Sequence, residues 1–98
     1  MATIRWMAEA ERWLQDIYGY IASDNPNAAG RVITGIYEKA QLLRQYPQSG
    51  SMYRSEPEGD IRILLFGHYR NAYLYNKENT VDILGVFHGA LDIDKYLP

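Results

Sequence analysis

The sequence contains no cysteine, which excludes disulfides, thiolate metal sites and a cysteine nucleophile. It also lacks any apolar run near the roughly 20 residues that a membrane-spanning helix needs. Its first residues hold no apolar stretch long enough for a signal peptide. Because a cysteine-free chain fits a reducing compartment, we expect a cytoplasmic protein without a membrane partner.

An excess of basic residues is missing as well. Ten lysines and arginines face twelve aspartates and glutamates, which gives a formal net charge of -2. A protein that grips a polyanion over a broad surface normally carries more cations than anions. We therefore expect no extensive direct nucleic-acid surface, although a few local arginines would still suffice to touch phosphates.

Motifs for metals and cofactors are absent from the sequence. The two histidines, His68 and His88, have no second ligand at a metal-binding spacing. No glycine-rich phosphate loop is present, and no serine nucleophile has a supporting pattern. We therefore expect neither a metal nor an organic cofactor.

The composition is that of a small globular domain. The chain has 98 residues, of which 47% are hydrophobic and 13% aromatic, so a packed core is available. A domain of this size buries only roughly 60 to 65% of the surface that its unfolded chain exposes. We expect modest stability, to which a partner that binds the folded state would add.

The first half of the chain predicts one strand and two helices. Residues 3–7 alternate apolar and polar side chains, as does a strand with one buried face. From Ala8 the apolar spacing becomes helical, and it breaks before Pro26, which begins a second helix. We expect Asn25 to cap this second helix, which extends to about Tyr46. The apolar stripe of the first helix comprises Ala10, Trp13, Leu14, Ile17 and Ile21, and that of the second comprises Ala29, Val32, Ile33, Ile36, Ala40 and Leu43.

The second half predicts a β-meander. Residues 48–60 are rich in glycine, proline and serine, which indicates an exposed connection with a short edge strand near residues 51–54. The tail, residues 91–98, has the length of one helical turn. Three strand-like runs lie between them, at residues 61–66, 69–76 and 81–88.

This order of elements defines the predicted fold class. A doubly wound sheet needs regular alternation of strands and helices, which is absent here. We predict one α+β domain over residues 1–98 with the order β-α-α-β-β-β. Its helical hairpin should pack on one face of a mainly antiparallel four-stranded sheet.

The last predicted hairpin holds the residues with the most chemical potential. If its turn is centred near Glu78, Arg70 lies opposite Val86, and His68 lies opposite His88. Arg70 and His88 are then diagonal neighbours on one face. Such a pair is able to bind a phosphate and move a proton, as cleavage of RNA through its 2′-hydroxyl requires. A shift of one residue in the pairing would put the two on opposite faces.

The same residues also fit structural roles. Arg70 and His88 share strand parity with apolar neighbours, so each would instead hydrogen-bond Asp82 or a backbone carbonyl. Arg62, between two isoleucines, fits either a cation on the sheet surface or an anion ligand. The catalytic residues therefore stay unknown, and Arg62, Arg70 and His88 are the candidates if the protein is a nuclease. Three tyrosines line one strand face and are more typical of packing than of base stacking, namely Tyr69, Tyr73 and Tyr75.

Several local motifs resemble the RelE/ParE superfamily of bacterial toxins. They are IYGYIA followed by DNPNAA at the helix junction, LRQYPQSG at the helix exit, and the terminal strand pair YRNAY and VDILGVFHG. Their order and spacing extend the resemblance over nearly the whole chain. It implies the toxin of a type II toxin–antitoxin system, whose partner is a cognate antitoxin with a C-terminal segment that wraps the toxin.

The superfamily holds two activities, and the residues help to choose between them. RelE-like members cut mRNA on the ribosome, whereas ParE-like members poison DNA gyrase and have no known nuclease site. Arg70 matches the arginine in the Tyr-Arg strand of RelE-like enzymes. The basic cluster expected after the last strand is replaced by Gly89, Ala90 and Leu91, and Leu91 stands where many members have arginine.

The incomplete nuclease pattern and the acidic charge balance favour a ParE-like, non-enzymatic inhibitor of DNA gyrase. A ribosome-dependent mRNA endoribonuclease that uses Arg70 with Arg62 or His88 is the first alternative. A non-toxic module that still binds its antitoxin is the second.

Overall fold

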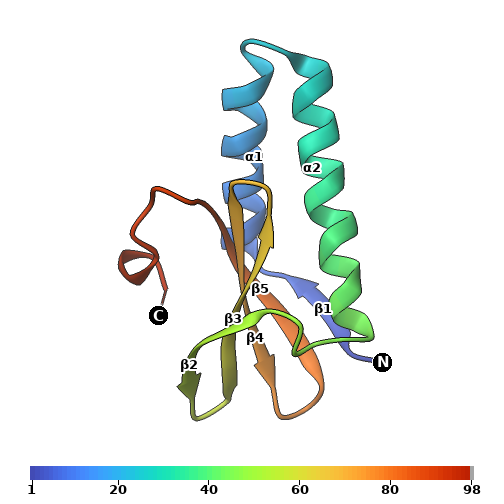
Figure 1. Cartoon of the computed structure of the whole chain (residues 1–98), viewed down its shortest axis with the longest axis vertical. Coiled ribbons are helices and arrows are strands. Elements are labelled where there is room, and N and C mark those ends of the chain that lie inside the picture. The colour runs from blue at the N-terminus through green and yellow to red at the C-terminus, as the bar shows by residue number, and fades with distance from the viewer. Residues whose placement is uncertain (98) are drawn as a thin grey trace.

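Two antiparallel helices pack against one face of a five-stranded sheet (Figure 1). The computed structural model describes residues 1–97. The first half consists of β1 (Thr3–Trp6), α1 (Ala8–Ala22), α2 (Pro26–Ala40) and the 3-10 turn η1 (Gln41–Arg44). The second half consists of β2 (Ser51–Glu56), β3 (Gly59–Phe66), β4 (Tyr69–Asn76), β5 (Thr80–His88) and the 3-10 turn η2 (Ile93–Lys95). Within the described part, no helix has the length and apolar character needed to cross a membrane.

The sheet order is β1-β5-β4-β3-β2. The N-terminal strand β1 pairs in parallel with β5, and the other neighbouring strands are antiparallel. This confirms the predicted α+β class with helices on one face. The expected count of four strands was too low, because the short strand anticipated near residues 51–54 extends to Glu56 and pairs with β3.

The helix boundaries follow local signals in the sequence. Asn25 caps α2 as predicted, since its side-chain oxygen accepts a hydrogen bond from the amide of Ala28 at 3.1 Å, and Pro26 occupies the first turn. The second helix was expected to reach about Tyr46, but α-helical geometry ends at Ala40. The tighter turn η1 follows and places Leu43 in the buried core.

Apolar clusters cover both faces of the sheet. On the helix face, Leu14 of α1 and Ile36 of α2 pack around Val86 of β5. On the opposite face, Ile93 of the C-terminal tail packs with Phe87 of β5. The outer end of the helical hairpin projects beyond the sheet (Figure 1). The tail therefore covers the second face only beside Phe87, and the outer end of the helical hairpin protrudes from the sheet.

Tyr73 ties the centre of the sheet to the loop before β2. Its side chain is fully buried, and its hydroxyl donates to the carbonyl of Pro47 at 2.8 Å. The same hydroxyl accepts from the amide of Gly50 at 3.0 Å. Because both backbone groups lie in a region with little access to water, the hydroxyl satisfies polar atoms that would otherwise be unpaired.

The variant Tyr73→Phe keeps the ring and removes only these hydrogen bonds. We expect the free energy of unfolding, measured by urea denaturation, to fall by about 1–3 kcal/mol. Tyr75→Phe is the matched control, because the Tyr75 hydroxyl contacts the exposed Asn79 side chain. That change should cost less than about 0.5 kcal/mol. Equal losses in the two variants would contradict the role given to Tyr73.

Tyr37 joins the two helices through a hydrogen bond from its hydroxyl to Glu11 at 2.8 Å. Desolvation, together with this bond, raises the pKa of Tyr37 to about 12, and desolvation also raises the pKa of Tyr73. The folded state thus keeps protons that an unfolded tyrosine loses near its ordinary pKa of about 10. This contribution to stability is complete below that value and is lost as the pH rises toward 12.

Phenolate absorbance should therefore show a late-titrating group among the nine tyrosines while the protein stays folded by circular dichroism. The variant Tyr37→Phe should lose one late-titrating phenol. A single uniform transition of all tyrosines in the folded protein would show that this environment is wrong.

Candidate functional site

A one-residue irregularity in β5 sets the geometry of the terminal hairpin. Ala72 pairs with Gly85, but the next residue, Tyr73, pairs with Ile83. Leu84 is therefore an extra residue in β5, as in a β-bulge. Between this point and the turn, the pairing is the one expected from the sequence. Beyond it, every pair is shifted by one.

The shift separates two of the residues that were expected to act together. Arg70 pairs with Phe87 instead of Val86, and His88 pairs with Tyr69. Since successive side chains of a strand point to opposite faces, Arg70 faces away from the helices while His88 lies on the helix side. The prediction that Arg70 and His88 are diagonal neighbours on one face is wrong, because the bulge moves them apart.

Arg70 anchors the C-terminal tail. Its Nη2 donates to the carbonyl of Leu91 at 2.6 Å and to that of Gly89 at 3.3 Å. Its Nε is buried without a partner. Of the two structural partners considered for this arginine, a backbone carbonyl is confirmed. The guanidinium is thus engaged in holding the segment that follows β5.

Asp82, the other partner considered, binds a different arginine. Arg5 of β1 donates from Nε to Oδ1 of Asp82 at 2.7 Å and from Nη2 to Oδ2 at 3.0 Å. The two residues are direct partners in the parallel pair of β1 and β5. The hydrogen bond and the charge of Asp82 raise the pKa of Arg5. The pair thus links the first strand to the last.

Arg62 anchors the loop before β2. Its Nη1 donates to the carbonyls of Gln48 at 3.1 Å and Gly50 at 2.8 Å, and its Nη2 lies 3.7 Å from Oδ2 of Asp60. Only 15% of the side chain is exposed. Arg62 is therefore not an exposed cation on the sheet surface. Like Arg70, it donates hydrogen bonds to backbone carbonyls.

The two histidines lie close together at the far end of the hairpin. The ring of His88 is 5.8 Å from that of Tyr69, edge to face, and 6.4 Å from that of His68. Nδ1 of His88 accepts a hydrogen bond from the amide of Ala90 at 3.3 Å. The sequence had placed the histidines directly opposite each other, and they are neighbours offset by one position. Neither Arg62 nor Arg70 joins them.

A hollow beside the histidines was not found from the sequence. We call it the α1 groove; its volume is about 480 Å³, and it is lined by Trp13, Asp16, Ile17, Tyr20, Tyr69, Val86, His88 and Leu91. Trp13 and Ile17 belong to the apolar stripe predicted for the first helix, whereas Asp16 and Tyr20 lie outside that predicted stripe. The spacing of Trp13, Asp16 and Tyr20 does place them on one side of α1. The spacing of residues in the sequence does not show that Tyr69 of β4 and Val86 and His88 of β5 form the other side of this groove.

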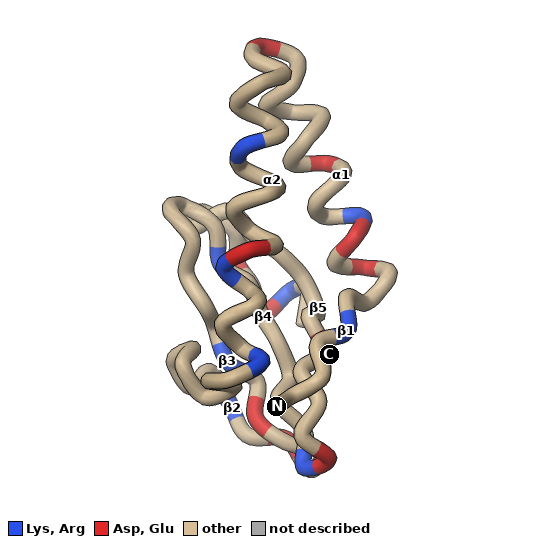
Figure 2. Tube along the Cα trace, turned by 90° about the vertical axis from the view of Figure 1, so that its right-hand side faces the viewer, with Lys and Arg blue, Asp and Glu red and all other residues tan. Residues whose placement is uncertain are grey.

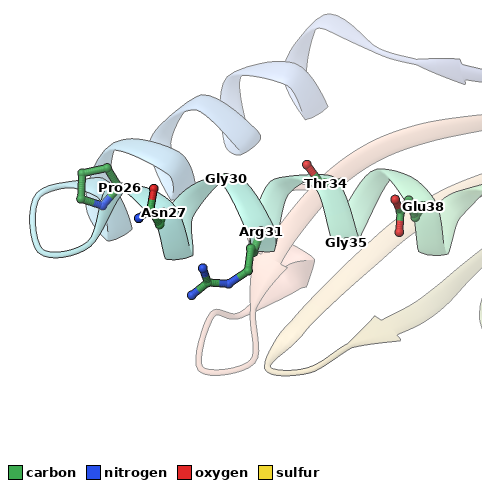
Figure 3. A pocket seen from close by; sticks show the side chains of 7 residues that line it. All are labelled: Pro26, Asn27, Gly30, Arg31, Thr34, Gly35 and Glu38. Atoms are coloured by element: carbon green, nitrogen blue, oxygen red, sulfur yellow. The ribbon is translucent and has the colours of Figure 1, made fainter.

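A shallower hollow of about 550 Å³ follows the outer side of α2 (Figure 3). It includes Gly30, Thr34 and Gly35, with Arg31 and Glu38 as its charged residues. Within residues 1–97, no group of three or more histidine, aspartate or glutamate side chains is arranged to hold a metal ion. Figure 2 shows basic positions scattered over several elements instead of gathered on one.

Two solved structures share the fold. One is a chain of the chromosomal ParDE TA system from P. aeruginosa, with a TM-score of 0.72 and 22% identity over 90% of this chain and 96% of that one. The other belongs to the toxin–antitoxin complex RelBE2 from Mycobacterium tuberculosis, with a TM-score of 0.58 and 27% identity over 89% of this chain and 96% of that one. The first likeness is evidence of fold alone.

Sequence comparison identifies the family. The candidate toxin Y4kP of Sinorhizobium fredii is 35% identical over 85 residues, which are 87% of this chain and 85% of that protein. The family described as ParE toxin of type II toxin-antitoxin system, parDE, matches residues 4–93. That match includes both helices and, apart from Thr3 at the start of β1, all five strands of the sheet. The chain therefore belongs to the ParE toxin family of type II toxin–antitoxin systems.

Proposed function

We propose that this toxin inhibits DNA gyrase in the cytoplasm by protein–protein contact, and that a cognate antitoxin neutralises it. The observation that carries the proposal is the engagement of Arg62 and Arg70 by backbone carbonyls. These are the arginines that the sequence offered for RNA cleavage. A toxin that does not cleave RNA needs neither arginine for catalysis, so both can keep these structural hydrogen bonds.

The chemistry of RNA cleavage supports the same choice. Stabilising the charge on a reacting phosphate requires a cation, and moving the proton requires a second group on the same side of the substrate. Arg70 and His88 face opposite sides of the sheet, as their pairing partners Phe87 and Tyr69 do. Redirecting Arg70 toward a substrate would also release the tail that it holds at Leu91.

The projecting hairpin supports a protein target. Tyr18 and Tyr20 of α1 are 45% and 84% exposed. Large aromatic side chains on a surface are typical of protein interfaces, where they bury much area with few rotatable bonds. Gyrase is the target that resemblance to ParE-like toxins implies, and the acidic charge balance suits a protein partner better than the RNA of a ribosome.

An antitoxin partner is supported by the two similar structures, which come from toxin–antitoxin systems. The sheet ends on one side in β1 and on the other in β2, and unpaired strand edges readily accept a strand from another chain. A small domain of this kind also gains stability when a partner binds only its folded form.

Expression of the chain without its partner should arrest growth and cause gyrase-dependent DNA breaks. With purified gyrase, the protein should inhibit supercoiling, and relaxation by a topoisomerase of another class should continue as the control. The cognate antitoxin should restore supercoiling. Intact supercoiling at doses that stop growth would reject gyrase as the target, and harmless expression with preserved antitoxin binding would indicate a non-toxic binding module.

Ribosome-dependent mRNA cleavage is the second candidate, favoured by the proximity of His68 and His88 and by the similarity to a RelBE2 complex. Mapping of transcript 5′ ends after induction separates the two candidates. Our proposal expects no new 5′ ends, and growth inhibition per amount of folded protein that is unchanged in Arg70→Ala. New 5′ ends that disappear in Arg70→Ala or in the double variant His68→Ala, His88→Ala would replace gyrase inhibition with cleavage.

A further inference from the structure

The α1 groove combines an apolar floor with aromatic walls. Val86 is buried at its base, and Ile17 and Leu91 are half-buried beside it. Three aromatic rings form its walls, those of Trp13, Tyr69 and the exposed Tyr20. The groove therefore offers a lining for a ligand that has both an apolar stem and a flat, polarisable end.

Two of the walls are held in place by their neighbours. The ring of Trp13 packs edge-on against Phe87 at 4.8 Å and against Tyr96 at 5.1 Å. The ring of Tyr69 packs edge-on against His88 at 5.8 Å. Side chains fixed in this way lose little conformational freedom when a ligand binds. The aromatic surface is thus organised in advance.

One carboxylate and one ionisable base line the groove, Asp16 and His88, and no lysine or arginine does. The nearest cation along α1, Arg12, is paired with Glu9, and Asp16 has no ion-pair partner among residues 1–97. Arg70 reaches the Leu91 carbonyl from the opposite face of the sheet. The groove therefore favours a cation and disfavours a phosphate or a carboxylate.

We propose that the α1 groove binds an arginine side chain presented by a protein partner. A guanidinium stacks on tryptophan or tyrosine rings, and its paired N–H groups match the two oxygens of a carboxylate such as Asp16. Its methylene stem fits the apolar floor. A lysine ammonium is more strongly hydrated and lacks the flat face. This inference goes beyond the proposed function, on which it rests only in expecting a protein partner.

A blocked arginine tests the site without any partner. Nα-acetyl-arginine methylamide is titrated into the isotope-labelled full chain, and the indole N–H of Trp13 is followed by NMR. We expect a saturable shift with a dissociation constant on the order of millimolar, as suits a single side chain. The corresponding citrulline compound has nearly the same shape without the charge. It should bind at least about fivefold more weakly, the loss expected when cation–π attraction is removed.

Two exposed positions provide variants that leave the core intact. Asp16→Asn should weaken the arginine compound but not the citrulline compound, and Tyr20→Leu should weaken the arginine compound. Asp24→Asn, in the turn after α1 and outside the groove, is the matched control and should change nothing. Circular dichroism checks that each variant is folded.

The proposal is overturned if the citrulline compound or a blocked leucine binds as tightly as arginine, or if Asp16→Asn binds arginine normally. Shifts scattered over the surface with no saturation at Trp13 would also overturn it. Because the probe is a small molecule, these outcomes do not depend on gyrase inhibition. The failure of one proposal is thus distinguishable from the failure of the other.

Discussion

One extra residue in β5 decides which side chains share a face of this sheet. Beyond Leu84, the pairing with β4 shifts by one position, and Phe87 comes to lie opposite Arg70. Gly85 belongs to this arrangement, because a Cβ atom there would lie 2.4 Å from the ring of Phe87. The ring is itself confined by Trp13 and Tyr96. The bulge and the glycine together place Phe87 where Ile93 of the tail packs against it.

The roles of two polar residues follow from the segments that lie against the sheet. The loop before β2 brings backbone carbonyls to Arg62, and the tail beside Phe87 brings backbone carbonyls to Arg70. Arg62 donates a hydrogen bond to a backbone carbonyl of the loop before β2, and Arg70 donates one to a backbone carbonyl of the tail. The residues available to other molecules then lie at the margin, where α1 passes the far end of the β4–β5 hairpin, and on the projecting hairpin tip. This arrangement suits the protein partners proposed above.

Much of the fold was predictable because it depends on local patterns. The periodicity of the apolar residues located both helices, and Asn25 before Pro26 marked the start of the second. The fifth strand was only partly predicted, because β2 extends beyond residues 51–54 into Ser55 and Glu56, which show no hydrophobic alternation. The turn η1 was missed because the apolar spacing of α2 continues through Leu43 while the backbone tightens.

The candidate site was less predictable for a different reason. The apolar run around Leu84 fits a regular strand, so the alternation of side chains did not indicate the register shift, and Gly85 inside the run was the only local signal of a bulge. Arg70 binds backbone carbonyls, which every residue carries, so the sequence does not show which carbonyls it binds. The proximity of His68 and His88 survived, because a shift of one position keeps strand neighbours within reach.

The arrangement of this sheet depends on the pairing of β4 with β5, which cross-strand nuclear Overhauser effects report. This pairing should give contacts between Tyr69 and His88 and between Arg70 and Phe87, with the Arg70 side chain near Leu91. Contacts that instead join Arg70 to Val86 would contradict it, since Arg70 and His88 would then share one face.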